Sequence, residues 1–175
     1  MELEKEEQVP QPVPDKTRPF SLKTVLVPID FSECSEKALE YAGPFCREFG
    51  AQAILLYVAQ FHYAGSEQYL DMAEWEAGTR RTAEAKLTEL ARKTLPEGVK
   101  FVIKVAPGRP FLSIVENARN LQADLIIIST HGHTGTAADT LGSTTERVVH
   151  YAPCPVLVVR PIERDFLPEA TRRPR

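Results

Sequence analysis

Short apolar runs alternate along the chain with segments that repeat apolar residues every three or four positions. The apolar runs predict five strands, over Thr24–Ile29, Ala53–Val58, Val99–Val105, Asp124–Ile128 and Val156–Val159. The segments with helical spacing predict helices over Ser35–Phe49, from Thr79 to the turn at Pro96, from Pro110, and from about Gly142. This alternation predicts an α/β fold, an open five-stranded parallel sheet with helices on both faces.

Two of the predicted strands carry patterns that are typical of a sheet edge. In Val99–Val105 apolar residues alternate with Lys100 and Lys104, which predicts a strand with one partly wet face. Val156–Val159 is uniformly apolar and lacks the charge that usually protects an exposed edge, so we expect something to cover it. A second copy of the chain and the chain's own tail are the two candidates.

The most informative stretch is the loop Ser129–Ser143, which directly follows the fourth predicted strand. In an open α/β sheet ligands bind at the carboxyl ends of the strands, where glycines tolerate a positive φ and let backbone N–H groups approach an anion. The loop contains Gly132, Gly135 and Gly142. Its last residue begins the pattern Ser-Thr-Thr-Glu of a capping box, which predicts that Ser143 caps a helix whose N-terminus faces the loop. The stretch is either a phosphate-binding loop or a turn of small residues.

Asp30 and Ser32 follow the first predicted strand and introduce the first helix. An aspartate in that position is a turn or cap residue, a ligand-binding residue, or both. If the first and fourth strands are adjacent and parallel, Asp30 and Ser129 emerge at the same edge of the sheet and flank one crevice. The sequence therefore predicts a site formed by two segments that are distant along the chain.

Length and composition are those of one soluble domain, because 43% of the 175 residues are hydrophobic and 26% are charged. A formal net charge of -3 argues against a nucleic-acid surface, which normally carries a basic stripe. The three cysteines are odd in number and widely spaced, which disfavours a disulfide framework and suits a reducing cytoplasm. The apolar runs are too short to predict a membrane span.

The two ends of the chain differ in composition from the middle. Residues 1–22 are acidic and then rich in proline, without the basic and apolar regions of a secretory signal. Residues 162–175 combine prolines with arginines. We therefore predict flexible tails over 1–22 and 162–175, on either side of one domain over 23–161.

Several motifs together are similar to those of one known family. The first motif is Ser129-x-x-Gly132, followed after nine residues by Gly142-Ser143. The second is the segment Ala152–Arg160, and the third is Val25–Ser32, a predicted strand that ends in an acidic turn. These motifs resemble the universal stress protein family over about residues 23–161. The resemblance implies a Rossmann-like nucleotide-binding fold of the adenine nucleotide alpha hydrolase-like type. The family's ATP-binding members carry G-x2-G-x9-G-[S/T], and in this chain Ser129 replaces the first glycine.

The resemblance implies that the chain binds ATP, with magnesium held by the phosphates, and acts as a regulator or sensor in the stress response. It implies an ATP site made of Pro28, Asp30, Val58, Ile128, Ser129, Gly132, Gly142, Ser143 and Thr144. In that site Asp30 and Val58 would orient the nucleoside, while the glycines and Ser143 would hold the phosphates. The family also implies a cytoplasmic homodimer formed through Val156–Val159.

Two other functions compete with nucleotide binding alone. The first is a module that binds another protein and no nucleotide, because the family contains such members and Ser129 departs from the glycine motif. The second is an ATP-using enzyme, because Thr130–His133 fits the [H/T]-x-G-H pattern of nucleotidyltransferases. In those enzymes the motif follows the first strand, whereas here it follows the fourth, so this function is the weaker candidate.

Catalytic and metal sites have little support in the sequence. The motifs of P-loop hydrolysis, dinucleotide redox chemistry and serine hydrolases are missing from the chain. His131, His133 and Asp139 are fewer ligands than a metal site usually supplies, so we predict no metal centre and no catalytic residue. At most, slow ATP hydrolysis or self-phosphorylation would use the hydroxyls of Ser143–Thr145, which helix capping also explains.

Overall fold

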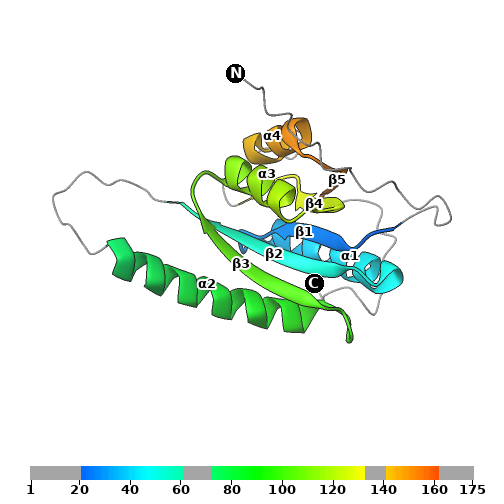
Figure 1. The fold of residues 1–175 in the computed structure, drawn as a ribbon, viewed down its shortest axis with the longest axis horizontal. Helices are drawn as coiled ribbons and strands as arrows, with labels where there is room; N and C mark the ends of the chain where they lie inside the picture. Colours follow the sequence, from blue (N-terminus) through cyan, green and yellow to red (C-terminus); the bar gives the residue numbers. More distant parts are fainter. Residues whose placement is uncertain (1–20, 61–71, 133–140, 162–175) are drawn as a thin grey trace, which may run out of the picture.

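The computed structural model describes residues 21–60, 72–132 and 141–161. Within these residues strands and helices alternate without exception along the chain (Figure 1). The elements are β1 (Thr24–Pro28), α1 (Glu33–Phe49), β2 (Gln52–Ala59), α2 (Met72–Thr94), β3 (Phe101–Pro107), α3 (Pro110–Asn120), β4 (Leu125–Ser129), α4 (Ser143–Tyr151) and β5 (Val156–Val159).

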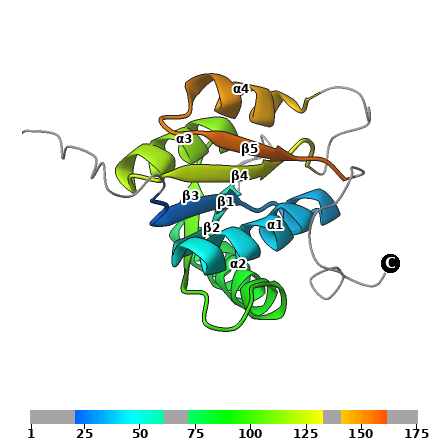
Figure 2. The ribbon, with the colours of Figure 1, turned by 90° about the vertical axis from the view of Figure 1, so that its right-hand side faces the viewer.

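The strands form one parallel sheet in the order β3-β2-β1-β4-β5, which confirms the predicted five-stranded sheet. β1 lies at the centre, with Val25 opposite Ala53 of β2 on one side and opposite Leu125 of β4 on the other. Figure 2 shows β5 at one edge, followed by β4 and β1 toward the middle of the sheet. The prediction that the first and fourth strands are adjacent and parallel is therefore correct, and so are both predicted edges.

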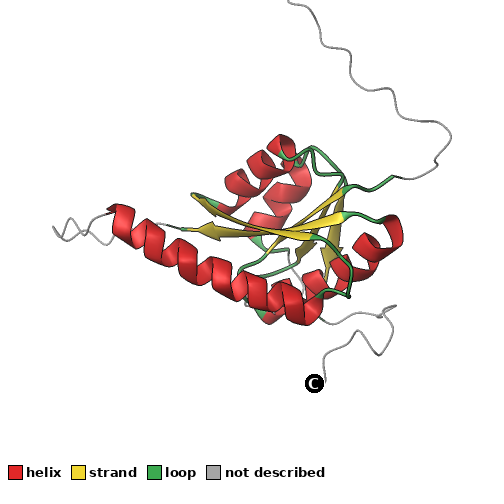
Figure 3. Ribbon diagram, turned by 60° about the horizontal axis from the view of Figure 1, so that its bottom comes forward, coloured by secondary structure: helices red, strands yellow, loops and turns green. Residues whose placement is uncertain are grey.

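Helices cover both faces of the sheet, as predicted (Figure 3). On one face α1 and α2 bury an apolar cluster that includes Leu39 and Leu87, both fully inaccessible to solvent. On the other face α3 and α4 cover a second cluster, which includes Ile114 and Val148. Fully burying an aliphatic side chain of this size stabilises the fold by roughly 1.5–3 kcal/mol, so these two layers hold the central strands in place.

The beginning of β1 is fixed by a residue from far along the chain. Asp124, just before β4, accepts hydrogen bonds at Oδ2 from the backbone nitrogens of Lys23 (2.8 Å) and Thr24 (2.9 Å). By accepting from both backbone N–H groups, the carboxylate satisfies two donors that would otherwise bond only to water. β1 and β4 are thus joined at their amino ends as well as along the sheet.

Several element boundaries differ from the predicted ones by one or two residues, among them the starts of α1, at Glu33, and of β3. β3 begins at Phe101 and not at Val99, whose nitrogen instead donates to the carbonyl oxygen of Pro96 in a turn (3.2 Å). α2 begins at Met72, so the helix that the sequence marks clearly from Thr79 also includes the end of the preceding segment and continues through Gly78. The predicted apolar face of α2 is confirmed, since it is buried at Ala83, Leu87, Leu90 and Ala91.

The predicted tails lie almost wholly outside the described residues, apart from Ser21 and Leu22. Leu22 packs against the core cluster that includes Leu39. None of the helices in residues 21–60, 72–132 and 141–161 is long and apolar enough to cross a membrane.

Candidate functional site

The candidate site lies at the carboxyl ends of β1 and β4, the two strands at the middle of the sheet. After β1 the chain enters α1 on one face, and after β4 it leads to α4 on the opposite face. The region outside this edge of the sheet, where the chain changes direction, is where open α/β sheets bind ligands. Asp30 follows β1 and Ser129 ends β4, so the structure brings both residues to this edge as predicted.

Asp30 acts as a turn residue at the start of α1. Its Oδ1 accepts hydrogen bonds from the backbone nitrogen of Ser32 (3.0 Å) and from the Ser32 hydroxyl (2.5 Å). Ser32 is in turn the N-cap of α1, because its hydroxyl oxygen accepts from the backbone nitrogen of Ser35 (3.2 Å). The predicted turn role of Asp30 is confirmed, and the two bonds fix the orientation of its carboxylate.

Gly132, from the loop after β4, lies directly against that carboxylate. A Cβ atom placed on Gly132 would be 2.1 Å from Oδ2 of Asp30 and 3.2 Å from its Cγ. The absence of a side chain at Gly132 is what allows the two loops to approach one another. The structure therefore places a fixed carboxylate and an exposed glycine side by side at this edge of the sheet.

Gly142 forms the other boundary of the loop, and the reason for a glycine there differs from the predicted one. Its φ is -62°, which any residue adopts, so no positive φ is involved. A Cβ atom on Gly142 would instead be 3.0 Å from the carbonyl oxygen of Thr130, which accepts a hydrogen bond from the Gly142 nitrogen (2.9 Å). Close backbone packing, and not backbone conformation, favours glycine at this position.

The predicted capping box of α4 is wrong by one residue. Gly142 is the N-cap, and it makes no side-chain capping bond, because glycine carries no acceptor. Ser143 is the exposed first residue of the helix and Thr144 the half-buried second. A helix N-terminus without a side-chain acceptor favours an anion at that end, through its first backbone N–H groups and its dipole.

Two hydroxyl groups hold α4 and the loop against β4. Thr145 is buried and donates from Oγ1 to the carbonyl oxygen of Ser129 (2.8 Å). Ser129 donates from Oγ to the carbonyl oxygen of His131 (2.9 Å) and is itself only 6% exposed. The serine that replaces the motif glycine thus directs its side chain to the loop backbone, and the Thr145 hydroxyl is already engaged.

Thr130 and His131 lie between Ser129 and Gly132, two residues of the predicted ATP site. Thr130 is buried, and its nitrogen donates to the carbonyl oxygen of Val159 in β5 (2.9 Å). Its hydroxyl lies 3.1 Å from Nδ1 of His131. Nε2 of His131 is buried and has no hydrogen-bond partner within the described part of the chain. From the sequence, the T-x-G-H motif predicts that His131 lines the phosphate loop or is an exposed loop histidine.

The other predicted ATP-site residues lie along the same edge. Pro28 and Ile128 are buried near the carboxyl ends of β1 and β4. Val58 is half-buried in β2, two positions beyond Leu56, the residue that pairs with Pro28. Their roles toward a ligand stay predictions. Gly135, His133 and Asp139 lie outside the described residues, and within those residues no group of three potential ligands could hold a metal ion.

Phe31, next to Asp30, has a feature that no sequence pattern indicated. Its φ is +64°, an uncommon value for a bulky residue. Its ring packs on Tyr57 with a centroid distance of 5.1 Å, and the Lys86 ammonium lies 5.7 Å from the ring centroid. These contacts connect the Asp30 turn to β2 and α2.

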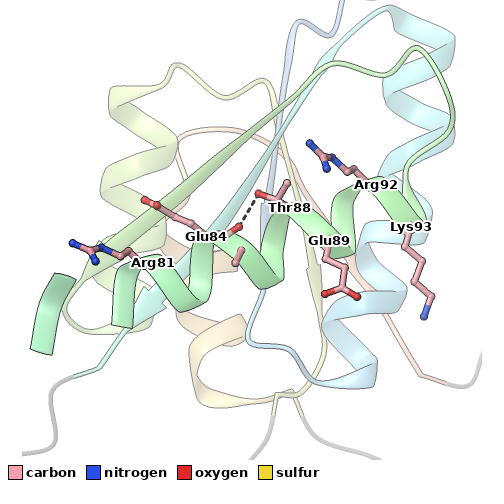
Figure 4. Close-up of a pocket in the computed structure, with 7 residues that line it drawn as sticks. Arg81, Glu84, Thr88, Glu89, Arg92 and Lys93 are labelled. Atoms are coloured by element: carbon pink, nitrogen blue, oxygen red, sulfur yellow. Dashed lines mark hydrogen bonds between the residues drawn. The ribbon is translucent and has the colours of Figure 1, made fainter. Parts of the chain in front are cut away.

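A shallow groove along the exposed side of α2 lies away from this edge (Figure 4). All of its lining residues come from this one helix, and they include both acidic and basic side chains such as Glu84, Glu89 and Arg92. Ligand sites usually have walls from several elements and a few convergent polar groups. The groove has neither feature, so we place the candidate site at the carboxyl edge.

The cysteines carry no reactive thiolate at neutral pH. Burial raises the pKa of the Cys46 thiol to about 12. Burial is also the main cause of the raised pKa values of Cys34 and Cys154, with a smaller contribution from the negative charge of Asp30 at Cys34. A protonated thiol is a poor nucleophile and a poor metal ligand, so these residues do not suggest chemistry of their own.

The parallel sheet and the close contact between Asp30 and Gly132 define an open α/β protein with a candidate ligand site at its strand ends. The model of the universal stress protein family matches residues 21–160, so the chain belongs to that family. Universal stress protein MJ0531 of Methanocaldococcus jannaschii is 34% identical over 144 residues, which cover 79% of this chain and 82% of the relative.

Solved structures share the fold. That of the hypothetical protein MJ0577 of the same organism is 29% identical, with a TM-score of 0.69 over 82% of this chain and 99% of the other. Two structures at 21% identity contain nucleotides. One is a universal stress protein in complex with cAMP (TM-score 0.60, 81% of this chain and 98% of the other). The other is a universal stress protein from Archaeoglobus fulgidus in complex with dAMP (TM-score 0.53, 78% and 96%).

Proposed function

We propose that this protein binds an adenine nucleotide, ATP with magnesium, at the carboxyl edge of β1 and β4, and that it regulates or senses stress through this binding. The contact between Gly132 and the Asp30 carboxylate is the observation that carries the proposal. Any side chain at Gly132 would fill the space between the two loops, beside a helix N-terminus that lacks a side-chain cap. The two family members solved with cAMP and dAMP support the same ligand class.

The residues at the edge divide into two sets in this proposal. Asp30 is a carboxylate with a fixed orientation, suited to accept hydrogen bonds from the hydroxyls or amino group of a nucleoside. Gly132 and Ser143 supply backbone N–H groups and one exposed hydroxyl near the start of α4, which suits phosphate oxygens. The N–H of Gly142 donates to the Thr130 carbonyl oxygen, so Gly142 keeps this end of the loop closely packed. Magnesium would be held by the phosphates, which need no protein ligand cluster for it.

Ser129 is compatible with this ligand. The sequence alone suggested that its side chain would stand where backbone approaches the nucleotide. Because its hydroxyl instead donates to the His131 carbonyl oxygen and the residue is 6% exposed, the replacement of glycine adds little bulk to the crevice. This geometry favours nucleotide binding over a module that binds only another protein.

We also propose that two copies of the chain associate through β5 in the cytoplasm. Val156, Leu157 and Val158 are only half-buried although they are apolar, and β5 is an edge strand of the sheet. Val149 and Tyr151 of the neighbouring helix α4 are 47% and 64% exposed. An apolar strand edge beside exposed apolar side chains is a surface that a partner strand would cover.

A calorimetric titration of nucleotide-stripped protein with ATP and magnesium tests the nucleotide proposal. We expect binding in the parent and a loss of affinity in Gly142→Ala, because the added methyl group meets the Thr130 carbonyl oxygen. Gly78→Ala is the matched control, since a Cβ there has no heavy atom within 4 Å. No heat and no competition in the parent would exclude ATP and leave a protein-interaction module. Turnover that is abolished in His131→Ala would instead indicate an ATP-using enzyme.

A further inference from the structure

A second groove lies between α2 and the turn that follows β1, and we call it the aromatic groove. The turn contributes Phe31, β2 contributes Tyr57, and α2 contributes Gly78, Thr79, Thr82, Ala83 and Lys86. Its volume of about 460 Å³ is within the usual range of small-molecule sites. Unlike the groove along the exposed side of α2 (Figure 4), it has walls from three parts of the fold.

The aromatic groove is separate from the proposed nucleotide site. Tyr57 packs against the core cluster that includes Leu39, on the face that α1 and α2 cover. Val58, the next residue, packs against the cluster on the opposite face. Successive side chains of a strand point to opposite faces of the sheet. A ligand in the groove would therefore lie across the sheet from Val58, the residue predicted to orient the nucleoside.

Phe31 adopts a costly backbone conformation at the edge of this groove. Its φ of +64° is a value at which glycine or asparagine is favoured. The turn between Asp30 and Ser32 alone would favour one of those residues. A phenylalanine there instead places an aromatic ring 5.1 Å from the ring of Tyr57. Because residues in such conformations concentrate at ligand sites, this pair of rings is a reason to look for a ligand.

The lining groups favour a flat ligand that carries a negative charge. Phe31 and Tyr57 are half-buried, and their rings offer a surface on which another aromatic ring packs well. Lys86 is exposed and is the one charged residue among the described lining residues. Its ammonium lies 5.7 Å from the centroid of the Phe31 ring, so a carboxylate attached to the ligand's ring would find a cation beside it.

Thr82 adds a preference for a donor on the ligand's ring. Its hydroxyl donates to the carbonyl oxygen of Gly78 (3.0 Å), so its oxygen is left as an acceptor. An N–H group such as that of indole suits this acceptor.

We propose that the aromatic groove binds a small aromatic carboxylate, whose ring packs on Phe31 and Tyr57 and whose carboxylate pairs with Lys86. The inference goes beyond the proposed function, and it does not require that the protein binds a nucleotide.

Three small probes and two charge reversals test this inference. Indoleacetate carries the ring and the carboxylate, tryptamine carries the same ring with an ammonium, and acetate carries the carboxylate alone. NMR titrations of the full chain measure the affinity for each probe in the parent, in Lys86→Glu and in Lys93→Glu. Lys93 is the matched control, because it is an exposed lysine of α2 that lines the other groove. Urea denaturation checks that both variants are folded.

We expect the parent to bind indoleacetate roughly 10-fold more tightly than tryptamine or acetate, because only indoleacetate matches both the rings and the cation. Lys86→Glu should reverse the order of indoleacetate and tryptamine, since it replaces the cation by an anion. Lys93→Glu has the same net charge and should keep the parent's order. Saturating ATP with magnesium should not displace indoleacetate.

The inference is overturned if the parent does not bind indoleacetate, if tryptamine or acetate binds as tightly, or if the two variants give the same order of affinities. Displacement of indoleacetate by ATP would also overturn it, because the probe would then occupy the nucleotide site. The calorimetric titration of the parent tests ATP binding without these probes, so a failure of the nucleotide proposal and a failure of this one are distinguishable.

Discussion

Gly132→Ala is the substitution for which the structure gives the clearest expectation. The added Cβ would lie 2.1 Å from Oδ2 of Asp30, so the two atoms must separate by roughly 1 Å to reach ordinary contact. A carboxylate without partners would turn aside at little cost. Asp30 cannot do so without weakening the bonds that its Oδ1 accepts from Ser32 at 3.0 and 2.5 Å. We therefore expect a loss of about 1–3 kcal/mol in unfolding free energy, the usual cost of overpacking.

The assay is urea denaturation of four proteins, the parent, Gly132→Ala, Asp30→Ala and the double variant. Removing the carboxylate also removes the clash, so Gly132→Ala should cost about 1 kcal/mol less in the Asp30→Ala background than in the parent. Gly78→Ala is the control for adding a methyl group to a glycine. It lies inside α2 with open space around it and should gain about 0.5–1 kcal/mol from helix propensity.

The same set of proteins tests the site. Gly132→Ala displaces the carboxylate that we assign to the nucleoside, so ATP affinity should fall while Gly78→Ala keeps the parent's affinity. If Gly132→Ala costs the same stability with and without Asp30, the contact between these two residues is not the reason for the glycine. The geometric basis of the proposed site would then be wrong.

Two further predictions concern the sheet edge and a buried thiol. Pro155 and Val159 direct their carbonyl oxygens to β4, so by alternation the backbone groups of Val158 point away from the sheet. Val158→Pro should therefore turn a dimer into a monomer of 19.6 kDa in light scattering while the sheet stays folded, and a dimer that persists would contradict association through β5. The Cys46 thiol keeps its proton in the folded protein up to a pKa of about 12, whereas the unfolded chain ionises near 9.0. Its contribution to stability is complete below pH 9 and is lost as pH rises toward 12, by at most about 1.4 kcal/mol per pH unit. Urea midpoints between pH 9 and 11 should fall less steeply in Cys46→Ala, and parallel slopes would show that burial does not suppress the ionisation.

The fold was predictable because the hydrophobic patterns that define its strands and helices are local and periodic. The apolar run of β4 and the helical spacing on α1 each identify an element without reference to the rest of the chain, and β/α alternation then leaves few topologies. The start of α2 is not marked by a local pattern, and the sequence predicts only a loop that merges into the helix before Thr79. Gly78 interrupts the pattern, and the helix continues through it because the buried face at Leu87 and Leu90 secures the helix further along.

The candidate site was predictable in outline but not in its contacts. Residue types at the two strand ends located Asp30 and Gly132 at one edge, since parallel strands end on the same side. The distance between them, the one-residue shift of the α4 cap and the orientation of Ser129 depend on how two distant loops pack, which no local pattern encodes. The unpaired nitrogen of His131 could not be predicted either, because the burial of an atom is a property of the folded chain.

The central position of β1 has a consequence for how the protein is made. Both of its ends meet residues from near β4, at Asp124 on one side and at Gly132 on the other. A nascent chain that has reached only α2 has neither the strand that completes its centre nor the loop that faces Asp30. Contacts between residues that are distant along the chain slow folding, and the candidate site forms only when the whole sheet has formed. A nucleotide held there would bind the native state alone, so it would shield the entire domain, and not just one loop, from proteolysis.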